Sequence, residues 1–198
     1  MTSSLVGSEM CIRDRFKIKF RIVDDIQLLS TIQTKIFDDE YDQILGFFQI
    51  SFGAHQEGVY YHENQLKEDE EGSELLDYWF DKILLVAILL DSESDYVAFK
   101  EIETVNRWIE FTKRDNNVFI NVAVDDICQN NNLIITEKYQ FSHIEPLNYV
   151  MPYQDLKCQI LEVSEKFLTE LNQINPNLCK TKICKALQQK IDIIKIKS

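Results

Sequence analysis

The sequence is poor in the residues and motifs that usually mark a catalytic site. It has 3 His and 5 Gly in 198 residues, and it contains no Gly-rich phosphate loop, no nucleophile elbow, no paired histidine ligands and no CxxC pair. Enzymes of this size usually carry one of these features. Their absence leads us to expect a protein that performs no catalysis and needs no cofactor.

Long hydrophobic runs are also missing. The longest, residues 83–90, has 8 residues, whereas a helix needs roughly 20 to span a bilayer. Residues 1–15 have neither the apolar stretch of a signal peptide nor the Arg-rich pattern of a transit peptide. The odd number of cysteines, 5, favours reduced thiols. These features together predict a cytoplasmic protein with no membrane contact.

Basic residues are outnumbered by acidic ones. The chain has 33 acidic and 21 basic residues, a formal net charge of −12. Residues 151–198 contain 8 Lys against 5 acidic residues, a net of +3, so residues 1–150 carry −15. Proteins that bind nucleic acid instead gather Lys and Arg on one face, because they must attract phosphate. Direct binding to nucleic acid is therefore not expected.

The composition is that of an ordinary globular protein. Hydrophobic residues make up 45% and charged residues 27%, a balance that excludes wholesale disorder. Residues 1–15 differ from the rest, and their string SLVGSEMCIRDR resembles a translated sequencing-adaptor artefact. We treat them as a non-native or disordered tail. The expected single α+β domain covers residues 16–198, with strands over 16–150 and helices over 152–196.

Alternating apolar side chains predict most of the strands. Residues 16–22 place Phe and Ile on one face and Lys and Arg on the other, which is typical of a half-buried strand. Residues 44–62 predict a hairpin with glycine-containing turns, and residues 96–102 predict a further strand. The clearest hairpin is 107–124, whose two arms flank the turn sequence KRDNN.

Apolar residues with helical spacing predict three helices. Ser73 is expected to cap a helix that continues to Leu90 and is apolar nearly all round in its second half. Residues 156–171 and 178–194 predict a C-terminal helical hairpin. The expected fold is α+β, with an antiparallel sheet packed by one central amphipathic helix and this hairpin. On a continuous last helix, Cys179 and Cys184 would point roughly 140° apart, a poor geometry for a bridge.

Acidic residues gather in four segments, 38–42, 68–81, 91–95 and 125–126. One such cluster alone suits a solubilising surface. Four clusters within the part that carries −15 indicate a surface that steers a basic partner into place. Nearby tyrosines supply anchors, because Tyr is enriched at binding hot spots. The candidate partner-binding residues are Asp38, Asp39, Glu40, Tyr41, Asp42, Tyr60, Tyr61, Glu68, Asp69, Glu70, Glu71, Glu74, Asp77, Tyr78 and Asp81.

The middle of the chain resembles a known class of proteins. The segments LLDYWFDKILLVAILL, YVAFKEI and RWIEFTKRDNNVFINV resemble small acidic cytosolic bacterial proteins of polymorphic toxin systems, which act as immunity proteins. The resemblance covers residues 44–124 and consists of core patterns, so it transfers no binding residue. It implies an intracellular, non-catalytic protein that blocks a toxin. An acidic inhibitor suits a nuclease-type toxin with a basic cleft.

Two other functions remain open from the sequence. The string HQEGVYYHE contains His55, Glu57 and His62, which could meet across a hairpin turn and hold a metal ion for a small hydrolase. These residues lie in an expected turn, whereas a zinc site needs three or four ligands on rigid elements, so we expect no metal there. A structural subunit that docks through its Lys-rich C-terminal helices is the third interpretation.

Overall fold

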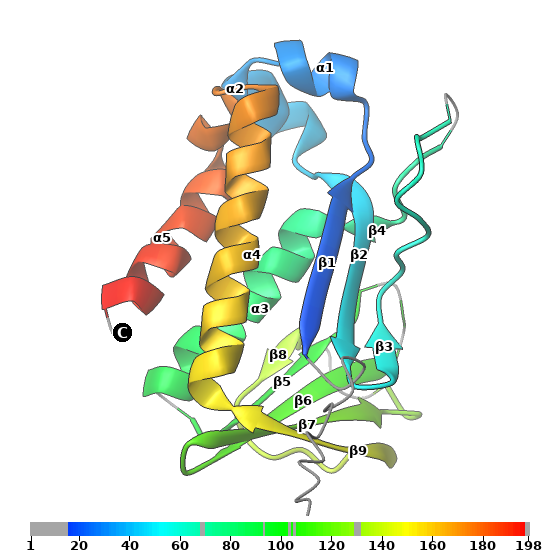
Figure 1. Ribbon diagram of the computed structural model, residues 1–198, viewed down its shortest axis with the longest axis vertical. Helices are drawn as coiled ribbons and strands as arrows, with labels where there is room; N and C mark the ends of the chain where they lie inside the picture. Colours follow the sequence, from blue (N-terminus) through cyan, green and yellow to red (C-terminus); the bar gives the residue numbers. More distant parts are fainter. Residues whose placement is uncertain are drawn as a thin grey trace, which may run out of the picture.

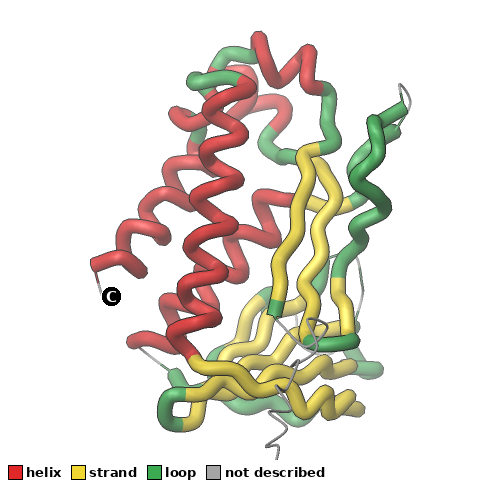
Figure 2. The backbone as a smooth tube through the Cα atoms, viewed as in Figure 1, coloured by secondary structure: helices red, strands yellow, loops and turns green. Residues whose placement is uncertain are grey.

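The computed structural model describes residues 16–67, 70–92, 94–102, 104, 106–128 and 132–196. Helices and strands are both abundant, and the strands form two antiparallel sheets rather than the one expected (Figure 1). The α+β fold class is therefore confirmed. Figure 2 shows the helices gathered on one side of the strands. None of the helices in the described residues combines the length and the apolar character that crossing a bilayer requires.

The first sheet is built around β2, which pairs with three other strands. Phe20 lies opposite Phe48 in the longest of these pairings, and Gly53, with a φ of +66°, makes the turn that follows. The predicted strand 16–22 is confirmed. A hairpin lies within 44–62, but its second arm is His55–Glu57, which we expected to form a turn, and residues 59–62 are not a strand. The strands of this sheet are β1 (Lys17–Ile22), β2 (Leu45–Phe52), β3 (His55–Glu57) and β4 (Glu74–Leu75).

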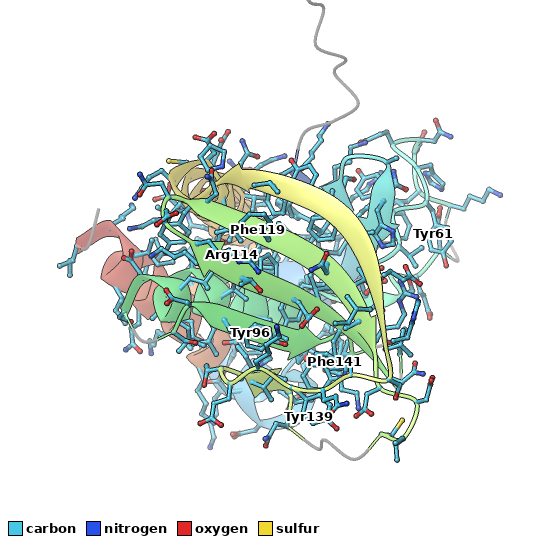
Figure 3. All side chains as sticks on the ribbon, turned by 90° about the horizontal axis from the view of Figure 1, so that it is seen from below. Tyr61, Tyr96, Arg114, Phe119, Tyr139 and Phe141 are labelled. Atoms are coloured by element: carbon cyan, nitrogen blue, oxygen red, sulfur yellow. The ribbon has the colours of Figure 1, made fainter. Side chains whose placement is uncertain are left out.

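The second sheet has the strand order β8-β5-β6-β7-β9. Its centre is the predicted hairpin 107–124, with Trp108 opposite Ala123 and Phe111 opposite Ile120. One part of its outer face is covered by Tyr139 and Phe141, which pack with Tyr96 and Trp108 in a small second core (Figure 3). The strands are β5 (Tyr96–Lys100), β6 (Arg107–Arg114), β7 (Asn117–Val124), β8 (Ile134–Ile135) and β9 (His143–Pro152).

Short helical turns connect β1 to β2, and two long helices end the chain. The C-terminal pair, α4 and α5, confirms the predicted helical hairpin. In Figure 1 both helices lie on the same side of the molecule, and α4 runs beside β1. The connecting turns are α1 (Ile26–Thr31), α2 (Thr34–Ile36) and the π-helix η2 (Phe37–Tyr41), and the C-terminal elements are α4 (Tyr153–Ile174), the 3-10 turn η3 (Leu178–Lys180) and α5 (Lys182–Ile196).

The predicted central helix, α3 (Leu76–Ser92), is covered on several sides. Trp79 stacks on Phe48 of β2 with 4.6 Å between ring centroids, and it meets Phe99 of β5 edge-on at 5.8 Å. One side chain thus contacts both sheets. Phe80 stacks on Phe167 of α4 at 4.3 Å. This coverage explains why the helix is apolar nearly all round.

The start of α3 differs from the prediction. The helix begins at Leu76, because Glu74 and Leu75 pair with β2 as β4. Ser73 therefore does not cap the helix. Glu74 is 1% exposed, and its carboxylate accepts hydrogen bonds from Trp79 Nε1 at 2.7 Å and from the Val59 backbone N–H at 2.9 Å. These hydrogen bonds satisfy the carboxylate of Glu74, so it can be buried although we expected it at the surface.

The last predicted helix is divided, which changes the position of two cysteines. The backbone is extended at Thr181, and the Thr181 hydroxyl accepts a hydrogen bond from the Cys184 N–H at 3.3 Å as α5 begins. Since no continuous helix joins them, the helix geometry from which we expected Cys179 and Cys184 to point apart is absent. Both line one hollow of about 400 Å³. Both thiols are free, and burial raises the pKa of each.

A buried ion pair fixes the C-terminal end of α3. Lys157 of α4 is 1% exposed, and its Nζ lies 3.1 Å from Asp91 Oδ2. Lys113 Nζ donates to the Leu90 carbonyl at 2.8 Å, and the Tyr153 hydroxyl donates to the Ala87 carbonyl at 2.7 Å. Cations and donors at this end suit the carbonyl groups that a helix terminus leaves without partners.

We predict that the substitution Asp91→Ala destabilises the protein by about 3 kcal/mol, because it leaves the Lys157 ammonium buried without its carboxylate. The double variant Asp91→Ala/Lys157→Met should unfold at a higher denaturant concentration than Asp91→Ala alone, since a buried charge is then removed. Chemical denaturation followed by circular dichroism measures both. Equal or lower stability of the double variant would contradict this role of the ion pair.

Candidate functional site

A hollow of about 540 Å³ lies where β1 ends and β2 begins. Figure 1 shows α1 and the segment that follows β3 on either side of this end of the first sheet. Four carboxylate side chains line the hollow, and none of its lining residues in the described part of the chain is Lys or Arg. The residues that line it are Val23, Asp24, Asp25, Ile26, Gln27, Tyr41, Leu45, Glu70 and Glu71. We refer to it as the acidic hollow.

Asp24 organises one wall of the acidic hollow. It lies two residues after the end of β1, and its Oδ2 accepts the Leu45 backbone N–H at 2.8 Å. Its Oδ1 accepts the Tyr41 hydroxyl at 2.5 Å and the Asp25 N–H at 2.7 Å. Asp25 in turn caps α1, because its Oδ1 accepts the Leu28 N–H at 2.9 Å. Both carboxylates are thus held in place by bonds to neighbouring backbone.

Tyr41 reaches the hollow from the end of the π-helix η2. Its ring packs on the buried Phe37 with 5.8 Å between centroids. Burial and then the hydrogen bond to Asp24 raise the pKa of the Tyr41 hydroxyl well above its usual value of about 10. The hydroxyl therefore stays neutral and remains a donor at physiological pH. A partner would meet a fixed Tyr41–Asp24 pair at this wall.

Glu70 and Glu71, from the segment between β3 and β4, line another part of the hollow, and described residues of this segment are fixed at several points. Glu70 Oε1 lies 2.6 Å from His62 Nε2, and Glu70 Oε2 accepts the Lys67 N–H at 3.1 Å. The Lys67 backbone N–H and then His62 lower the pKa of the Glu70 carboxyl. The Gly72 N–H donates to the Val23 carbonyl at 3.0 Å. The segment is thereby tied to the end of β1, with Glu70 and Glu71 beside the hollow.

The structure joins two of the acidic segments that the sequence singled out. Tyr41 from the first and Glu70 and Glu71 from the second line the same hollow. Asp24 and Asp25, which complete it, were not predicted. The available signal was an Asp pair placed one residue beyond the end of a predicted strand, where a turn or a helix cap is common. Glu68 and Asp69 lie outside the described residues.

The other residues of the first acidic segment lie outside the hollow. Asp38 Oδ1 accepts the Lys182 N–H at 2.9 Å and so contacts the beginning of α5. Asp39, Glu40 and Asp42 are exposed, and Asp42 adopts a left-handed conformation with a φ of 49°. These three carboxylates can contact a partner beside the hollow, but they do not line it.

The predicted tyrosines 60 and 61 lie over the first sheet. Both rings pack edge-on against Phe47, at 6.0 Å for Tyr60 and 5.1 Å for Tyr61. Tyr61 is 61% exposed, and Figure 3 shows it at the margin of the molecule, apart from Tyr96, Tyr139 and Phe141. Burial and a hydrogen bond to Glu63 raise the pKa of Tyr60 to about 12. Neither tyrosine lines the acidic hollow.

Four predicted residues at and after β4 make internal contacts. Glu74 is buried, so the prediction that it offers its charge at the surface is wrong. Asp77 accepts the Ile44 N–H at 3.0 Å, and its burial raises the pKa of its carboxyl. The Tyr78 hydroxyl donates to the Lys100 carbonyl at 2.7 Å. Asp81 forms ion pairs with Lys82 and Lys190.

The three proposed metal ligands of the alternative function do not come together: His55 and Glu57 are in contact, but His62 has a different partner. His55 Nε2 lies 2.5 Å from Glu57 Oε1, and Glu57 forms an ion pair with Arg107. His62 contacts Glu70 in the next segment instead. The described residues contain no group of three or more His, Cys, Asp or Glu side chains that could hold a metal ion. The described residues therefore lack the geometry that a metal-assisted hydrolase would require.

A second buried acid, Glu101, lies beside the Glu57–Arg107 pair. Its Oε1 accepts the Gly58 N–H at 3.3 Å, whereas its buried Oε2 has no hydrogen-bond partner among the described residues and lies 3.9 Å from Arg107 Nε. Burial and then the charge of Glu57 raise the pKa of the Glu101 carboxyl. This carboxyl joins the first sheet to the second, because Gly58 follows β3 and Glu101 follows β5.

We predict that Glu101→Gln increases the free energy of unfolding at pH 7. An acid whose pKa is raised on folding opposes folding once it ionises, so the cost appears as the pH rises above the unfolded pKa of about 4.3. The gain should therefore shrink as the pH is lowered towards 4. Urea unfolding at several pH values measures it, with the exposed Glu137→Gln as the control. Lower stability of Glu101→Gln at pH 7 would show that ionised Glu101 is stabilising.

No protein-family model, curated protein or solved structure matches this chain. The acidic hollow therefore has to be interpreted from its own geometry. It presents four carboxylates, one fixed hydroxyl donor and three apolar side chains, Val23, Ile26 and Leu45. Such a site attracts cationic groups, and its apolar wall suits the aliphatic stem that carries the charge of a Lys or Arg side chain.

Proposed function

We propose that this chain is a non-catalytic binding protein that neutralises a basic protein effector, with the acidic hollow as its recognition site. The observation behind the proposal is that Asp24, Asp25, Glu70 and Glu71 line one hollow. A Lys or Arg side chain placed there gains charge-assisted hydrogen bonds that are stronger than neutral ones. Wrong partners that bring an acidic side chain would be repelled.

The surroundings of the hollow favour a protein partner over a small cation. Ile26 is 42% exposed and Leu28 is 38% exposed, and both belong to α1 at the border of the hollow. Exposed apolar side chains beside polar groups are typical of the surfaces that proteins use to bind each other. Asp39 and Glu40, exposed on the neighbouring η2, extend the negative surface around it.

The charge of the whole chain supports the same function. At −12 the protein attracts a basic partner over distances comparable to the screening length, about 8 Å in physiological salt. A nuclease-type toxin fits because its cleft must be basic to hold phosphate. This effector class agrees with the resemblance of residues 44–124 to cytosolic immunity proteins, and it is part of the proposal.

We predict that adding positive charge at the hollow abolishes capture of the partner, whereas the same charge elsewhere does not. The variant Gln27→Lys/Glu71→Lys changes two exposed side chains that line the hollow and make no hydrogen bond to other described residues. The control, Asp95→Lys/Gln140→Lys, changes the net charge equally at two exposed positions outside it. Each protein serves as bait in lysate of the source organism, with elution by a salt gradient and identification by mass spectrometry.

The expected result is a basic protein that wild type and the control retain and the hollow variant loses. Its association rate with the hollow variant should be at least about tenfold slower at low salt, and the difference should shrink as salt is added. If all three baits retain the same basic protein equally, that protein binds outside the acidic hollow. Retention of no basic protein would contradict the proposed function.

A further inference from the structure

β1 forms an edge of the first sheet. It pairs with β2 on one side, and no strand in the described part of the chain pairs with it on the other. An edge strand exposes a row of backbone N–H and C=O groups that can pair with another chain. The edge of β1 can therefore accept a further strand from another chain, at a site outside the acidic hollow.

The register of the sheet shows which backbone groups are free at this edge. The Phe48 N–H donates to the Val59 carbonyl at 2.9 Å, on the side of β2 that faces away from β1. Phe48 is the partner of Phe20, so Phe20 must also direct its N–H and C=O away from β2. By alternation the same holds for Ile18 and Ile22. No donor or acceptor among the described residues bonds to Ile18 or Phe20 on this side.

A groove of about 390 Å³ runs along this edge. One wall belongs to α4, which contributes Gln159, Glu162, Val163 and Lys166, and the other is formed where Tyr60 lies beside Lys19. Phe20 meets Phe167 of α4 edge-on at 5.6 Å, so the helix is fixed beside the strand. The groove thus offers unpaired backbone groups at its base and side chains on both sides.

The side chains of β1 divide the groove into an apolar and a basic side. Ile18 and Phe20 face the helices and are buried, whereas Lys17 and Lys19 face outward. Lys17 has no ion-pair partner among the described residues, and Lys19 Nζ lies 5.4 Å from the centroid of the Tyr60 ring. An added strand would follow the same alternation, with apolar side chains towards α4 and acidic side chains opposite the two lysines.

Charge also decides between a second copy of this chain and another partner. Two β1 edges paired antiparallel would place rows of Lys and Arg opposite each other, and like charges directly across a strand pair are destabilising. Acidic side chains at the same positions are stabilising. Two carboxylates, Glu63 and Glu162, also line the groove, but the lysines outnumber them, because Lys166 of α4 joins Lys17 and Lys19. Glu63 is in addition hydrogen-bonded to Tyr60.

We propose that the groove between β1 and α4 binds an extended acidic peptide segment as an added antiparallel strand, because the backbone of Ile18 and Phe20, unpaired among the described residues, lies beside Val163 of α4 and the lysines 17 and 19. This site is separate from the acidic hollow and takes a ligand of opposite charge. The segment has apolar and acidic residues in alternation. Its backbone supplies affinity and its side chains supply specificity, as in other complexes formed by strand addition.

The probe is the blocked peptide acetyl-Val-Glu-Val-Glu-Val-Glu-amide, added to the full chain labelled with ¹⁵N. Salt of about 0.15 M limits the repulsion between the peptide and the acidic chain. The expected shifts in the amide spectrum concentrate at Ile18, Phe20 and Val163. The variant Lys17→Glu/Lys19→Glu should bind this peptide about tenfold more weakly and should bind acetyl-Val-Lys-Val-Lys-Val-Lys-amide more tightly than wild type does.

Two N-methylated forms of the acidic peptide test strand addition itself. In an antiparallel pairing the valine N–H groups face β1, so methylation at the valines should remove binding while methylation at the glutamates should leave it. These peptides require no change to the protein, so misfolding cannot explain the result. Equal binding of both methylated forms, or no binding of the unmodified peptide, would overturn the proposal. A dimer formed through β1 would overturn it as well, and light scattering detects one.

Discussion

The burial of α3 is the constraint on which the rest of this structure depends. Its apolar side chains point in several directions, and burying each one stabilises the fold by roughly 1.5–3 kcal/mol. The Trp79 ring is covered by both sheets, because it contacts Phe48 of the first and Phe99 of the second. The Phe80 ring is covered by α4, where Phe167 stacks on it. A chain that left any of these sides open would lose much of its stability, so both sheets and the C-terminal helices are held around one helix.

This constraint also positions the acidic hollow. The buried carboxylate of Glu74 binds Trp79 Nε1 of α3 and the Val59 N–H, so the segment 59–72 is tied to the core at its two ends. Gly72 approaches the sheet so closely that a Cβ at that position would lie 2.3 Å from Gly46 N. Glu70 and Glu71 are therefore held next to the end of β1, where Asp24 is fixed by Leu45 and Tyr41. Core packing thus gathers charges that are far apart in the sequence.

Most of the fold could be predicted from the sequence, because its signals are local. Alternation with a period of two predicted β1 and the β6–β7 hairpin, and helical spacing predicted α3 and the C-terminal pair. The burial of Glu74 was not predicted, because it lies in a two-residue strand whose partners are distant in the sequence. The break at Thr181 was not predicted either: its hydroxyl accepts a hydrogen bond at the start of α5, where we expected a continuous helix. Of the candidate site it predicted Tyr41, Glu70 and Glu71 but missed Asp24 and Asp25, because no local pattern reveals which loops meet.

If the acidic hollow is the recognition site, a single cationic side chain should bind there in preference to the other acidic segments. An amide chemical-shift titration of the full chain with the blocked amino acid acetyl-arginine-amide, followed residue by residue, tests this. We expect saturable shifts at Asp24, Gln27, Tyr41 and Glu71 that weaken as salt increases. Shifts of equal size at the hollow, at Asp95 and at Asp126 would show that the charge acts only as a general acidic surface, and would contradict the claim.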